Sequence, residues 1–527
     1  MKAKHKAKRD LSRRGFIKAA SVGIGTAALA ELVSGEAKAS LLSQVSKWDY
    51  EAGIVVLGTG AAGLVTAITA HDQGTEVLIL EKAPEPHSGG NTRVSGQGAW
   101  CPTNLSDIIL YQKALSDGYP VPEDVIQVFH EYTVKNAEWL QKMGLEMRPP
   151  QGGRGPSGEY PEFPGSSGNA SCSPAGGPGS ERLWSALKDN VIKRKIRIMY
   201  ETPGTELIQD PQTREIRGVV AERQGKKLYA KAKKAVILCT GGFENNQEMI
   251  RDYLSMPCGY PKGSPYNTGD GIRMAMAAGA DLWHMDNQAG PDLNFKAPGV
   301  DWTFGYRFSP PGKGWIWIAK DATRFTNEAY YTKHGKIPFH GIYVPLPTPL
   351  PVHLIFDEAM RKSGPLYPPD SFFCWFAIIE KYKWSADNSA ELAKGWILKA
   401  DTIRDLAEKI GKNPDALEKT VAAWNRYCEA GKDPEYDRSA KLMAPIQTPP
   451  YYAMEFVPSF TNTQGGPRRN KYAQVLDTNR KPIPRLYSAG ELGSIFSYHY
   501  QGAGNLGECI AVGRIAGEHA AAEKPWS

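Results

Sequence analysis

IVVLGTGAAGLVTAITAHDQGTEVLILE, residues 54–81, decides the fold of this chain. A short apolar run typical of a buried strand leads into the glycine-rich turn 58–63 and a helix-like stretch at 64–71. A second apolar strand at 77–80 then ends at Glu81. In this arrangement the glycines permit a tight turn and the close approach of a pyrophosphate, the helix N-terminus faces the phosphates, and the acid accepts hydrogen bonds from ribose hydroxyls. The sequence therefore predicts a Rossmann-like dinucleotide-binding unit in an α/β fold.

A second glycine-rich segment follows the acid and indicates which dinucleotide is bound. It reads Gly89-Gly90-Asn91-Thr92 and then Ser95-Gly96-Gln97-Gly98. This segment resembles one in flavoproteins related to fumarate reductase and succinate dehydrogenase, where it runs along the FAD pyrophosphate and ring. Nicotinamide-only dehydrogenases lack it. The resemblance implies that the cofactor is FAD.

Five further motifs follow in the order of that family: VILCTGGF at 236–243, NTGDG at 267–271, RFTNE at 324–328, SAGE at 488–491 and GAGNLG at 502–507. The resemblance covers nearly all of residues 50–522. It implies an α/β fold with a Rossmann-like, glutathione-reductase-like FAD-binding domain and an inserted α+β capping domain that closes a substrate cleft. We expect the FAD-binding domain at 48–285 and 451–527 and the capping domain at 286–450.

The resemblance also implies the FAD contacts. They are Gly58, Gly60, Ala61, Ala62, Gly63, Glu81, Lys82, Gly89, Gly90, Asn91, Thr92, Ser95, Gly96, Thr240, Gly241, Gly242, Asp270, Gly490, Glu491, Asn505 and Leu506. Some relatives attach FAD covalently through a histidine of the second glycine-rich segment. That position falls near Thr92 here, and His87 lies earlier, so we expect non-covalent FAD.

The seven cysteines argue against a metal centre. They are scattered, and the sequence contains neither a CxxC pair nor a CxxCH motif, so iron–sulfur clusters and an attached haem are not expected. We expect no metal and no disulfide framework, with most of these cysteines acting as small buried hydrophobes.

Membership of this family implies hydride transfer at flavin N5, coupled to proton transfer on the adjacent carbon of a C–C bond activated by a carbonyl or carboxylate. The fumarate reductase branch clamps a dicarboxylate with arginines and histidines. In this sequence Thr332 or Lys333 stands where the proton-donating arginine belongs, Asn505 where a clamping arginine belongs, and Asn462 where a histidine is usual. A dicarboxylate desolvated without cationic partners is costly to bind, so fumarate is disfavoured.

The 3-ketosteroid dehydrogenase branch of the family fits better. Its Y-x-G-x-G signature matches Tyr500 to Gly504, and in that branch the tyrosine and the last glycine's N–H polarise the substrate ketone. A second tyrosine, the base, follows the RF-x-NE motif; Tyr331 is the nearest match and Tyr330 the alternative. The third matches Tyr160 in EYPEFPG, within a Gly/Pro/Ser-rich segment, 149–179, that we expect to be a loop over the active site.

Three functions remain to be weighed. The first is a dehydrogenase or reductase of a steroid-like or other bulky ketone or enone. The second is a reductase of an α,β-unsaturated carboxylate such as an aromatic acrylate, with Lys333, Arg307 or Arg468 replacing the missing clamp. The third, a flavoprotein that only transfers electrons between proteins, conflicts with the large capping insert. A separate electron partner, a c-type cytochrome or a quinone, is expected in the first two cases.

Residues 1–39 resemble a twin-arginine export signal. A basic segment precedes Ser12-Arg13-Arg14-Gly15-Phe16, a short Ala/Gly-rich apolar run follows, and Ala37-Lys38-Ala39 offers a cleavage site. These residues hold nine Lys/Arg and three acidic side chains, so most of the chain's net charge of +7 lies there and gives no indication of nucleic-acid binding. We expect a periplasmic protein that is not integral to the membrane.

Overall fold

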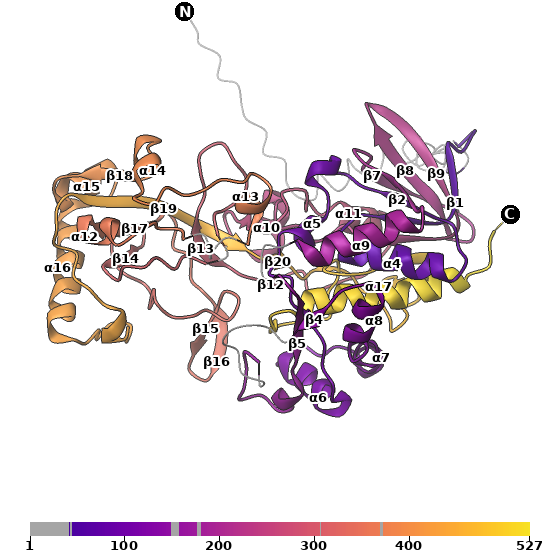
Figure 1. Ribbon diagram of the computed structural model, residues 1–527, viewed down its shortest axis with the longest axis horizontal. Coiled ribbons are helices and arrows are strands. Elements are labelled where there is room, and N and C mark those ends of the chain that lie inside the picture. The colour runs from indigo at the N-terminus through magenta and orange to yellow at the C-terminus, as the bar shows by residue number, and fades with distance from the viewer. Residues whose placement is uncertain are drawn as a thin grey trace, which may run out of the picture.

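The computed structural model describes residues 42, 45–148, 158–176, 181–305, 307–368 and 373–526. Two sheets lie at opposite ends of the long axis of the molecule (Figure 1). The predicted export signal, 1–39, lies outside the described residues, as do 149–157 and 177–179 of the Gly/Pro/Ser-rich segment.

The first sheet is built around β1 (Tyr50–Leu57). Its neighbours run parallel to it on both sides: β2 (Val77–Leu80) and then β6 (Arg197–Met199) on one side, and β9 (Lys226–Leu238) and then β23 (Pro482–Ser488) on the other. Three antiparallel strands complete the sheet: β7 (Gly204–Gln209), β8 (Ile216–Arg223) and β22 (Gln474–Leu476). A parallel core of this kind is buried on both faces and reads as continuous apolar runs, which is why the strand at 54–57 could be predicted.

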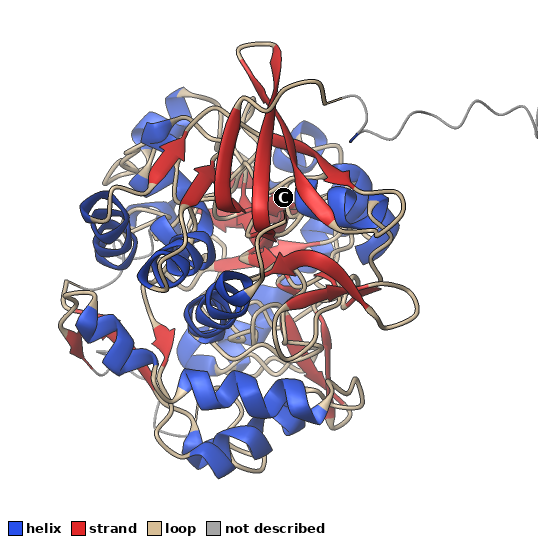
Figure 2. Ribbon diagram, turned by 90° about the vertical axis from the view of Figure 1, so that its right-hand side faces the viewer, coloured by secondary structure: helices blue, strands red, loops and turns tan. Residues whose placement is uncertain are grey.

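Helices cover both faces of this sheet (Figure 2). Side chains of β1 alternate between the faces: Ile54 and Val56 pack under one helix layer, whereas Val55 and Leu57 pack under the other. The first layer contains α4 (Ala61–Asp72), α9 (Arg182–Lys193) and α17 (Gly504–Ala522), and the second contains α10 (Gln247–Leu254) and α11 (Asp270–Ala277).

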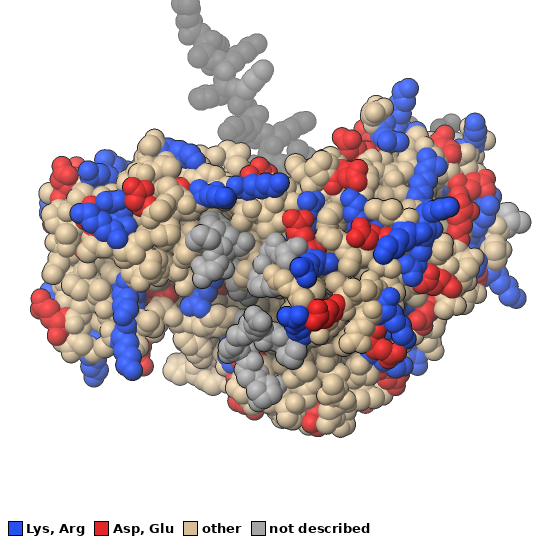
Figure 3. All heavy atoms as spheres, in the orientation of Figure 1, with Lys and Arg blue, Asp and Glu red and all other residues tan. Residues whose placement is uncertain are grey.

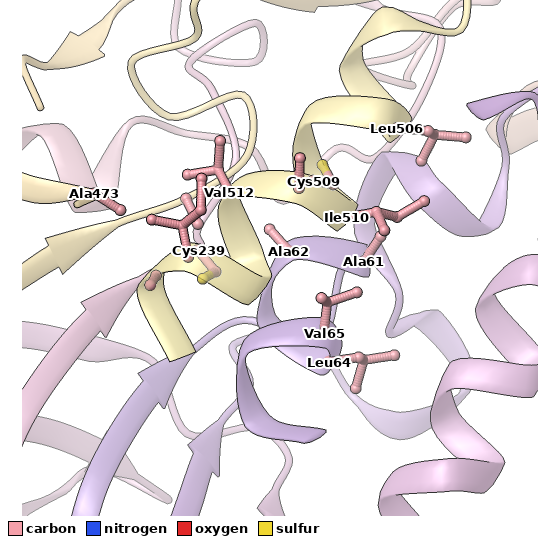
Figure 4. Close-up of a cluster of buried hydrophobic side chains, with 14 of the residues drawn as sticks. Ala61, Ala62, Leu64, Val65, Cys239, Ala473, Leu506, Cys509, Ile510 and Val512 are labelled. Atoms are coloured by element: carbon pink, nitrogen blue, oxygen red, sulfur yellow. The ribbon is translucent and has the colours of Figure 1, made fainter. Parts of the chain in front are cut away.

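Helices α4 and α17 pack closely because small residues line their contact. Figure 4 shows Ala61, Ala62 and Val65 of α4 beside Cys509 of α17. A Cβ at Gly513 would lie 3.0 Å from the Ala62 carbonyl oxygen, and one at Gly517 would lie 2.8 Å from the Thr66 carbonyl oxygen. The C-terminal helix is therefore part of the cofactor-binding core, although it is remote from α4 in sequence.

The second sheet is centred on β19 (Tyr451–Phe460), a long strand that extends from the far end of the second sheet towards the first (Figure 1). The other strands of this sheet are β10 (Tyr260–Pro261), β13 (Asp292–Phe295), β14 (Trp315–Ile318), β17 (Val352–Asp357) and β18 (Leu398–Ala400). The helices of this region are α12 (Glu358–Lys362), α13 (Trp375–Ile378), α14 (Ser389–Ala393), α15 (Ile403–Lys409) and α16 (Pro414–Ala430). The second sheet thus extends beyond the expected capping segment 286–450 at both ends.

Local sequence signals explain where helix α16 begins and ends. The Asn413 side chain accepts a hydrogen bond from the Ala416 N–H, Pro414 occupies the first turn, and Gly431 ends the helix with a positive φ. Its buried face, Leu417, Val421 and Trp424, packs onto the second sheet. Among the described residues, no helix combines the length and apolarity needed to span a bilayer.

Shorter elements connect and flank the two sheets. The helices are α5 (Gly90–Arg93), α6 (Leu105–Leu115), α7 (Glu123–Thr133), α8 (Asn136–Lys142) and the 3-10 turns η1 (Glu85–His87), η2 (Ser166–Gly168) and η4 (Ala440–Leu442). The strands are β3 (Ala99–Trp100), β4 (Met147–Arg148), β5 (Ser171–Pro174), β11 (Leu282–Trp283), β12 (Gln288–Ala289), β15 (Lys336–Phe339), β16 (Ile342–Pro345), β20 (Asn462–Thr463) and β21 (Gly466–Pro467).

One disulfide is present, although the cysteine spacing gave no indication of a disulfide framework. Cys101 and Cys172 are bonded, with their Cα atoms 6.0 Å apart, because β3 and β5 pair antiparallel and place Cys172 opposite Ala99. This pairing joins segments 71 residues apart and has no signature in the cysteine spacing. The other five cysteines are unpaired, and Cys239, Cys374 and Cys509 are buried as expected.

Replacing Cys101 and Cys172 together by serine is expected to lower the free energy of unfolding by about 2–4 kcal/mol, because the bond closes a long loop of the unfolded chain. Urea unfolding, read by tryptophan fluorescence, measures the loss. Cys258→Ser, at a half-buried unpaired thiol, is the control and should stay within about 0.5 kcal/mol of the parent. Labelling of seven thiols in the unreduced, denatured parent would show that the bond does not form.

Candidate active site

An open cavity lies at the carboxyl ends of β1, β2 and β9. Its volume is about 860 Å³ when the solvent space at its mouth is included. This is the edge of a parallel sheet where dinucleotides bind. Fourteen of the predicted FAD contacts line the cavity: Gly58, Gly60, Ala61, Ala62, Glu81, Lys82, Gly90, Asn91, Thr92, Thr240, Gly241, Asp270, Gly490 and Glu491. Its wall thus combines residues from both ends of the chain.

The three glycines of the first turn have different surroundings. A Cβ at Gly63 would lie 2.0 Å from the Gly58 carbonyl oxygen, and one at Gly58 would lie 2.4 Å from the Cys239 carbonyl oxygen. At Gly60 the nearest atom to an added Cβ is the Thr92 hydroxyl oxygen at 3.7 Å. Gly58 and Gly63 are therefore required by the protein's own packing, whereas the space above Gly60 is open to a ligand. This is the arrangement that a pyrophosphate needs at a helix N-terminus, so the cavity fits FAD.

Glu81 is held in position at the end of β2. One carboxylate oxygen accepts hydrogen bonds from the Thr59 N–H at 2.8 Å and the Thr59 hydroxyl at 2.5 Å, and the other accepts from the Ala83 N–H at 2.7 Å. Lys82 turns the other way and donates to the Thr268 hydroxyl and the Asp270 carboxylate, which joins β2 to the start of α11. Glu81 is thus oriented toward the place of a ribose.

Seven predicted contacts are not among the described cavity-lining residues: Gly63, Gly89, Ser95, Gly96, Gly242, Asn505 and Leu506. Several have internal packing roles; a Cβ at Gly89, for example, would lie 2.7 Å from the Trp184 ring. Sequence reasoning missed some lining residues that adjoin the motifs, such as Thr59, Asn267 and Ala489. Pro203, Gly204, Ser264 and Tyr266 also line the cavity and carry no motif that could have identified them.

Two buried carboxylates meet beside the cavity. The Asn91 side-chain amide donates to Glu244 at 2.8 Å and to Glu491 at 3.0 Å. Burial and then the charge of Glu244 raise the pKa of Glu491 well above its usual range. We therefore expect the pair to retain a proton at neutral pH.

A chain of hydrogen bonds leads from these carboxylates to Tyr500. The Thr463 hydroxyl donates to Glu244, the Asn505 amide donates to Asn462 at 2.6 Å, and the Asn505 backbone N–H donates to the Tyr500 hydroxyl at 3.4 Å. Asn462 and Asn505 stand where the fumarate reductase branch has a histidine and an arginine. In this chain the two side chains bind each other.

Gly504 does not match its predicted role. Its N–H donates to the Gln501 carbonyl at 2.9 Å, and the backbone N–H that reaches the Tyr500 hydroxyl belongs to Asn505. The Gly504 N–H, at the start of α17, thus donates to the preceding loop. The Y-x-G-x-G pattern does not reveal this local hydrogen bond.

Tyr160 is fully buried within an aromatic group beside Tyr500. Its ring centroid lies 5.0 Å from Phe163, 4.8 Å from His499 and 5.5 Å from Tyr343. The described part of the Gly/Pro/Ser-rich segment is held there by Gln501, whose side-chain oxygen accepts from the Glu159 N–H at 3.0 Å. Burial raises the pKa of Tyr160 well above its usual range, so its phenol is suited to donate a hydrogen bond and not to act as a base.

The structure favours Tyr330 over Tyr331 as the neighbour of Tyr160. Tyr331 is 39% exposed, and the Arg307 guanidinium lies 4.5 Å from its ring centroid. Burial is the main cause that raises the pKa of Tyr330. The neighbouring Tyr343 raises this pKa further, and the charge of Lys333 lowers it. Tyr330 is therefore also a poor base.

The cationic side chains of this region are already engaged. Lys333 lies 3.3 Å from Glu162, Lys336 donates to Asn287 and to the Tyr498 carbonyl, and Arg468 lies 2.7 Å from Asp281. Burial lowers the pKa of Lys336 to about 8, which reduces its use as a permanent cation. None of the three is arranged as a clamp for a dicarboxylate.

Comparison with known proteins agrees with this geometry. The family described as FAD binding domain matches residues 53–506. A fumarate reductase (cytochrome) from Shewanella frigidimarina is 30% identical over 482 residues, which cover 89% of this chain and 76% of that protein. A crystal structure of 3-ketosteroid Δ1-dehydrogenase from Sterolibacterium denitrificans, in complex with 1,4-androstadiene-3,17-dione, superposes with a TM-score of 0.72 at 25% identity and covers 90% of this chain and 99% of its own.

The fold is shared more widely. The open conformation of a flavocytochrome c3 fumarate reductase superposes with a TM-score of 0.67 at 23% identity, covering 98% of this chain and 83% of its own. The matched family, the cavity that fits FAD and these relatives point to one conclusion. The chain belongs to the FAD-dependent fumarate reductase and succinate dehydrogenase flavoprotein superfamily and is an FAD-dependent oxidoreductase that acts on CH–CH bonds.

Proposed function

We propose that this protein oxidises or reduces a C–C bond next to the carbonyl of a bulky, uncharged substrate, a 3-ketosteroid or a similar ketone or enone. Bound FAD supplies the two-electron step, and the chain's own side chains bind the substrate and move the proton. The residues proposed to hold FAD are the fourteen predicted contacts that line the cavity, with Thr59 and Asn267 added from the cavity wall.

The observation that carries this proposal is an aromatic cluster without available cations. Rings of Tyr160, Phe163, Tyr343 and His499 pack together, and Tyr500, which follows His499 in the chain, packs against His334 and Phe496. Contact between these aromatic rings and the faces of a polycyclic or aryl substrate is energetically favourable. Lysines beside it are paired with internal acceptors, so a carboxylate entering there would displace an existing ion pair.

A second candidate is the reduction of an α,β-unsaturated monocarboxylate. One observation favours it: the Lys333 ammonium lies 4.5 Å from the Tyr160 ring centroid, and its partner Glu162 is itself partly exposed. A single anionic group of the substrate could therefore replace Glu162 as the partner of Lys333. The relationship to fumarate reductase (cytochrome) supports this candidate more than the first.

We propose further that the protein works in the periplasm and exchanges electrons with a separate c-type cytochrome or a quinone. The twin-arginine pattern at residues 12–18 supports export, and the sequence contains no CxxCH motif that would attach a haem to this chain. On the face shown in Figure 3, acidic and basic side chains are interspersed over both halves of the molecule.

An anaerobic spectral experiment separates the two candidates. The purified protein is photoreduced, and flavin reoxidation is followed after separate addition of a 3-ketosteroid enone, a cinnamate-type acrylate and fumarate. The oxidised protein is mixed in parallel with a saturated 3-ketosteroid. Reaction with a ketosteroid supports the first proposal. Reoxidation by the acrylate with no response to any ketone would replace it with the second.

Tyr500→Phe is expected to lower the rate of the ketone reaction about 100-fold, because one hydrogen-bond donor to the developing oxyanion is lost. Stopped-flow flavin absorbance measures this rate, and FAD content should be unchanged. Tyr498→Phe, whose hydroxyl donates to the Tyr343 carbonyl, is the matched control. An equal loss in both variants would mean that the aromatic cluster acts only as packing.

A further inference from the structure

His334 and Glu159 form a buried acid–base pair next to Tyr500. The His334 Nε2 atom lies 3.0 Å from a Glu159 carboxylate oxygen, and the two side chains are 6% and 3% exposed. The imidazole also meets the Tyr500 ring edge-on, with centroids 4.5 Å apart. Glu159, His334 and Tyr500 come from three segments far apart in sequence, and the fold joins them at the predicted active site.

The turn that carries His334 is fixed at several points. The Thr332 hydroxyl donates to Asp292 at 2.5 Å, and Lys336 donates to Asn287 at 3.2 Å. A Cβ at Gly335 would lie 1.9 Å from the Gly290 carbonyl carbon, so this turn and the chain near β12 are in direct contact. The residues before, at and after His334 are thus anchored to different parts of the protein.

His334 itself has a left-handed backbone, with φ at 49°. Such a conformation is uncommon for a residue with a Cβ and is energetically unfavourable. It persists because the anchored neighbours determine it, and it directs the imidazole to Glu159 and Tyr500. Strained residues of this kind cluster at functional sites.

The reaction needs a group that exchanges a proton with carbon, and several of the expected candidates are poorly suited. Of the two residues that can stand where the fumarate reductase branch has its arginine, Thr332 donates its hydroxyl to Asp292 and Lys333 lies 3.3 Å from Glu162. Burial raises the pKa of both Tyr160 and Tyr330, so neither phenol readily gives up its proton. An imidazole beside a carboxylate is the ordinary alternative.

We propose that His334 is the proton-exchanging residue of the CH–CH reaction and that Glu159 positions it; this inference rests on the proposed function. In the oxidation direction, a C–H proton next to the carbonyl moves to the His334 imidazole, and bound FAD would accept the second hydrogen together with its electron pair. The C=C bond forms from the electrons of the broken C–H bond. Glu159 holds the ring orientation and stabilises the imidazolium, and Tyr500 donates to the carbonyl oxygen. Reduction is the reverse.

The first test is kinetic. His334→Gln retains a polar side chain of similar reach beside Glu159, and we expect flavin reduction or reoxidation to slow at least 100-fold with FAD content and KM for substrate preserved. Glu159→Gln should slow it about 10-fold or more. His353→Gln, at a buried histidine on β17, is the control and should react at the parent rate. A His334→Gln variant as fast as the parent would overturn the proposal.

The second test needs no turnover. In protein labelled with ¹⁵N-histidine, the His334 ring signals are assigned by their loss in His334→Gln. Charged or titratable groups near this ring include Glu159, Tyr500 and Asp292, and Lys333 and Lys336 lie in the same turn. We expect the midpoint of the His334 titration to fall by at least one pH unit in Glu159→Gln. An unchanged midpoint would overturn the pairing. If no proposed substrate reacts with the parent, the proposed function fails while this measurement still decides the pairing.

Discussion

Gly60→Ala is expected to yield a folded protein that does not retain FAD. The residue has φ −64° and ψ 175°, which alanine adopts without strain, and the added Cβ would meet the protein at no less than 3.7 Å. The methyl group would instead occupy the space over which the pyrophosphate passes. We expect a rise in Kd of roughly 100-fold or more, about 2.7 kcal/mol. The ratio of flavin to protein absorbance after purification, and titration of stripped protein with FAD, measure it.

Gly63→Ala is the informative counterpart. Its Cβ would lie 2.0 Å from the Gly58 carbonyl oxygen, so the damage falls on the packing of α4 against β1. We expect it to destabilise the protein by about 3 kcal/mol even without FAD. Equal stability of the two alanine variants, or normal FAD retention by Gly60→Ala, would contradict the assignment of these two glycines.

Arg324→Met should lower the free energy of unfolding by about 3–5 kcal/mol. The Arg324 guanidinium, 1% exposed, binds both oxygens of Glu328 at 2.7 and 2.8 Å and both oxygens of Asp433 at 3.0 and 2.8 Å. Removing the arginine leaves two carboxylates buried without their main counter-charge. Urea denaturation measures the loss.

Arg404→Met provides the matched control for Arg324→Met. Arg404 also contacts two carboxylates, Asp415 and Glu418, but it is 47% exposed, so we expect a much smaller loss of stability than in Arg324→Met. A similar loss of stability in both variants would mean that burial does not determine how much an arginine contributes to stability through its carboxylate partners. On this account the RF-x-NE motif primarily stabilises the second sheet region.

Local patterns in the sequence predicted the elements whose causes are local. The first βαβ unit was predicted because its apolar runs and glycines lie within a few residues of the structures they determine. The place of β19 in the second sheet could not be predicted, because nothing inside residues 451–460 indicates its partners β13, β17 and β18. Strand pairing depends on distant segments, and one sequence does not reveal it.

The candidate site also has a part that short sequence patterns predicted and a part that they did not. The dinucleotide motif and Tyr500 are visible as short patterns, and most of the predicted cofactor contacts do line the cavity. The His334–Glu159 contact joins residues 175 positions apart; His334 belongs to no motif, and Glu159 lies in the EYPEFPG segment, which drew attention only to its tyrosine. The choice between Tyr330 and Tyr331 depends on the direction of a side chain, which spacing alone did not determine.

The position of β23 and α17 has a consequence for biosynthesis. Strand β23 pairs directly with β9, and α17 packs on α4, so the final part of the chain completes a core begun near its start. Gly490, Glu491 and Cys509 line the same cavity as Gly58 and Gly60. A nascent chain that does not yet include β23 and α17 therefore lacks one wall of the cofactor site, and FAD can be captured only after these elements have been made. Premature stop codons anywhere before α17 should yield apoprotein, however much of the second sheet has formed.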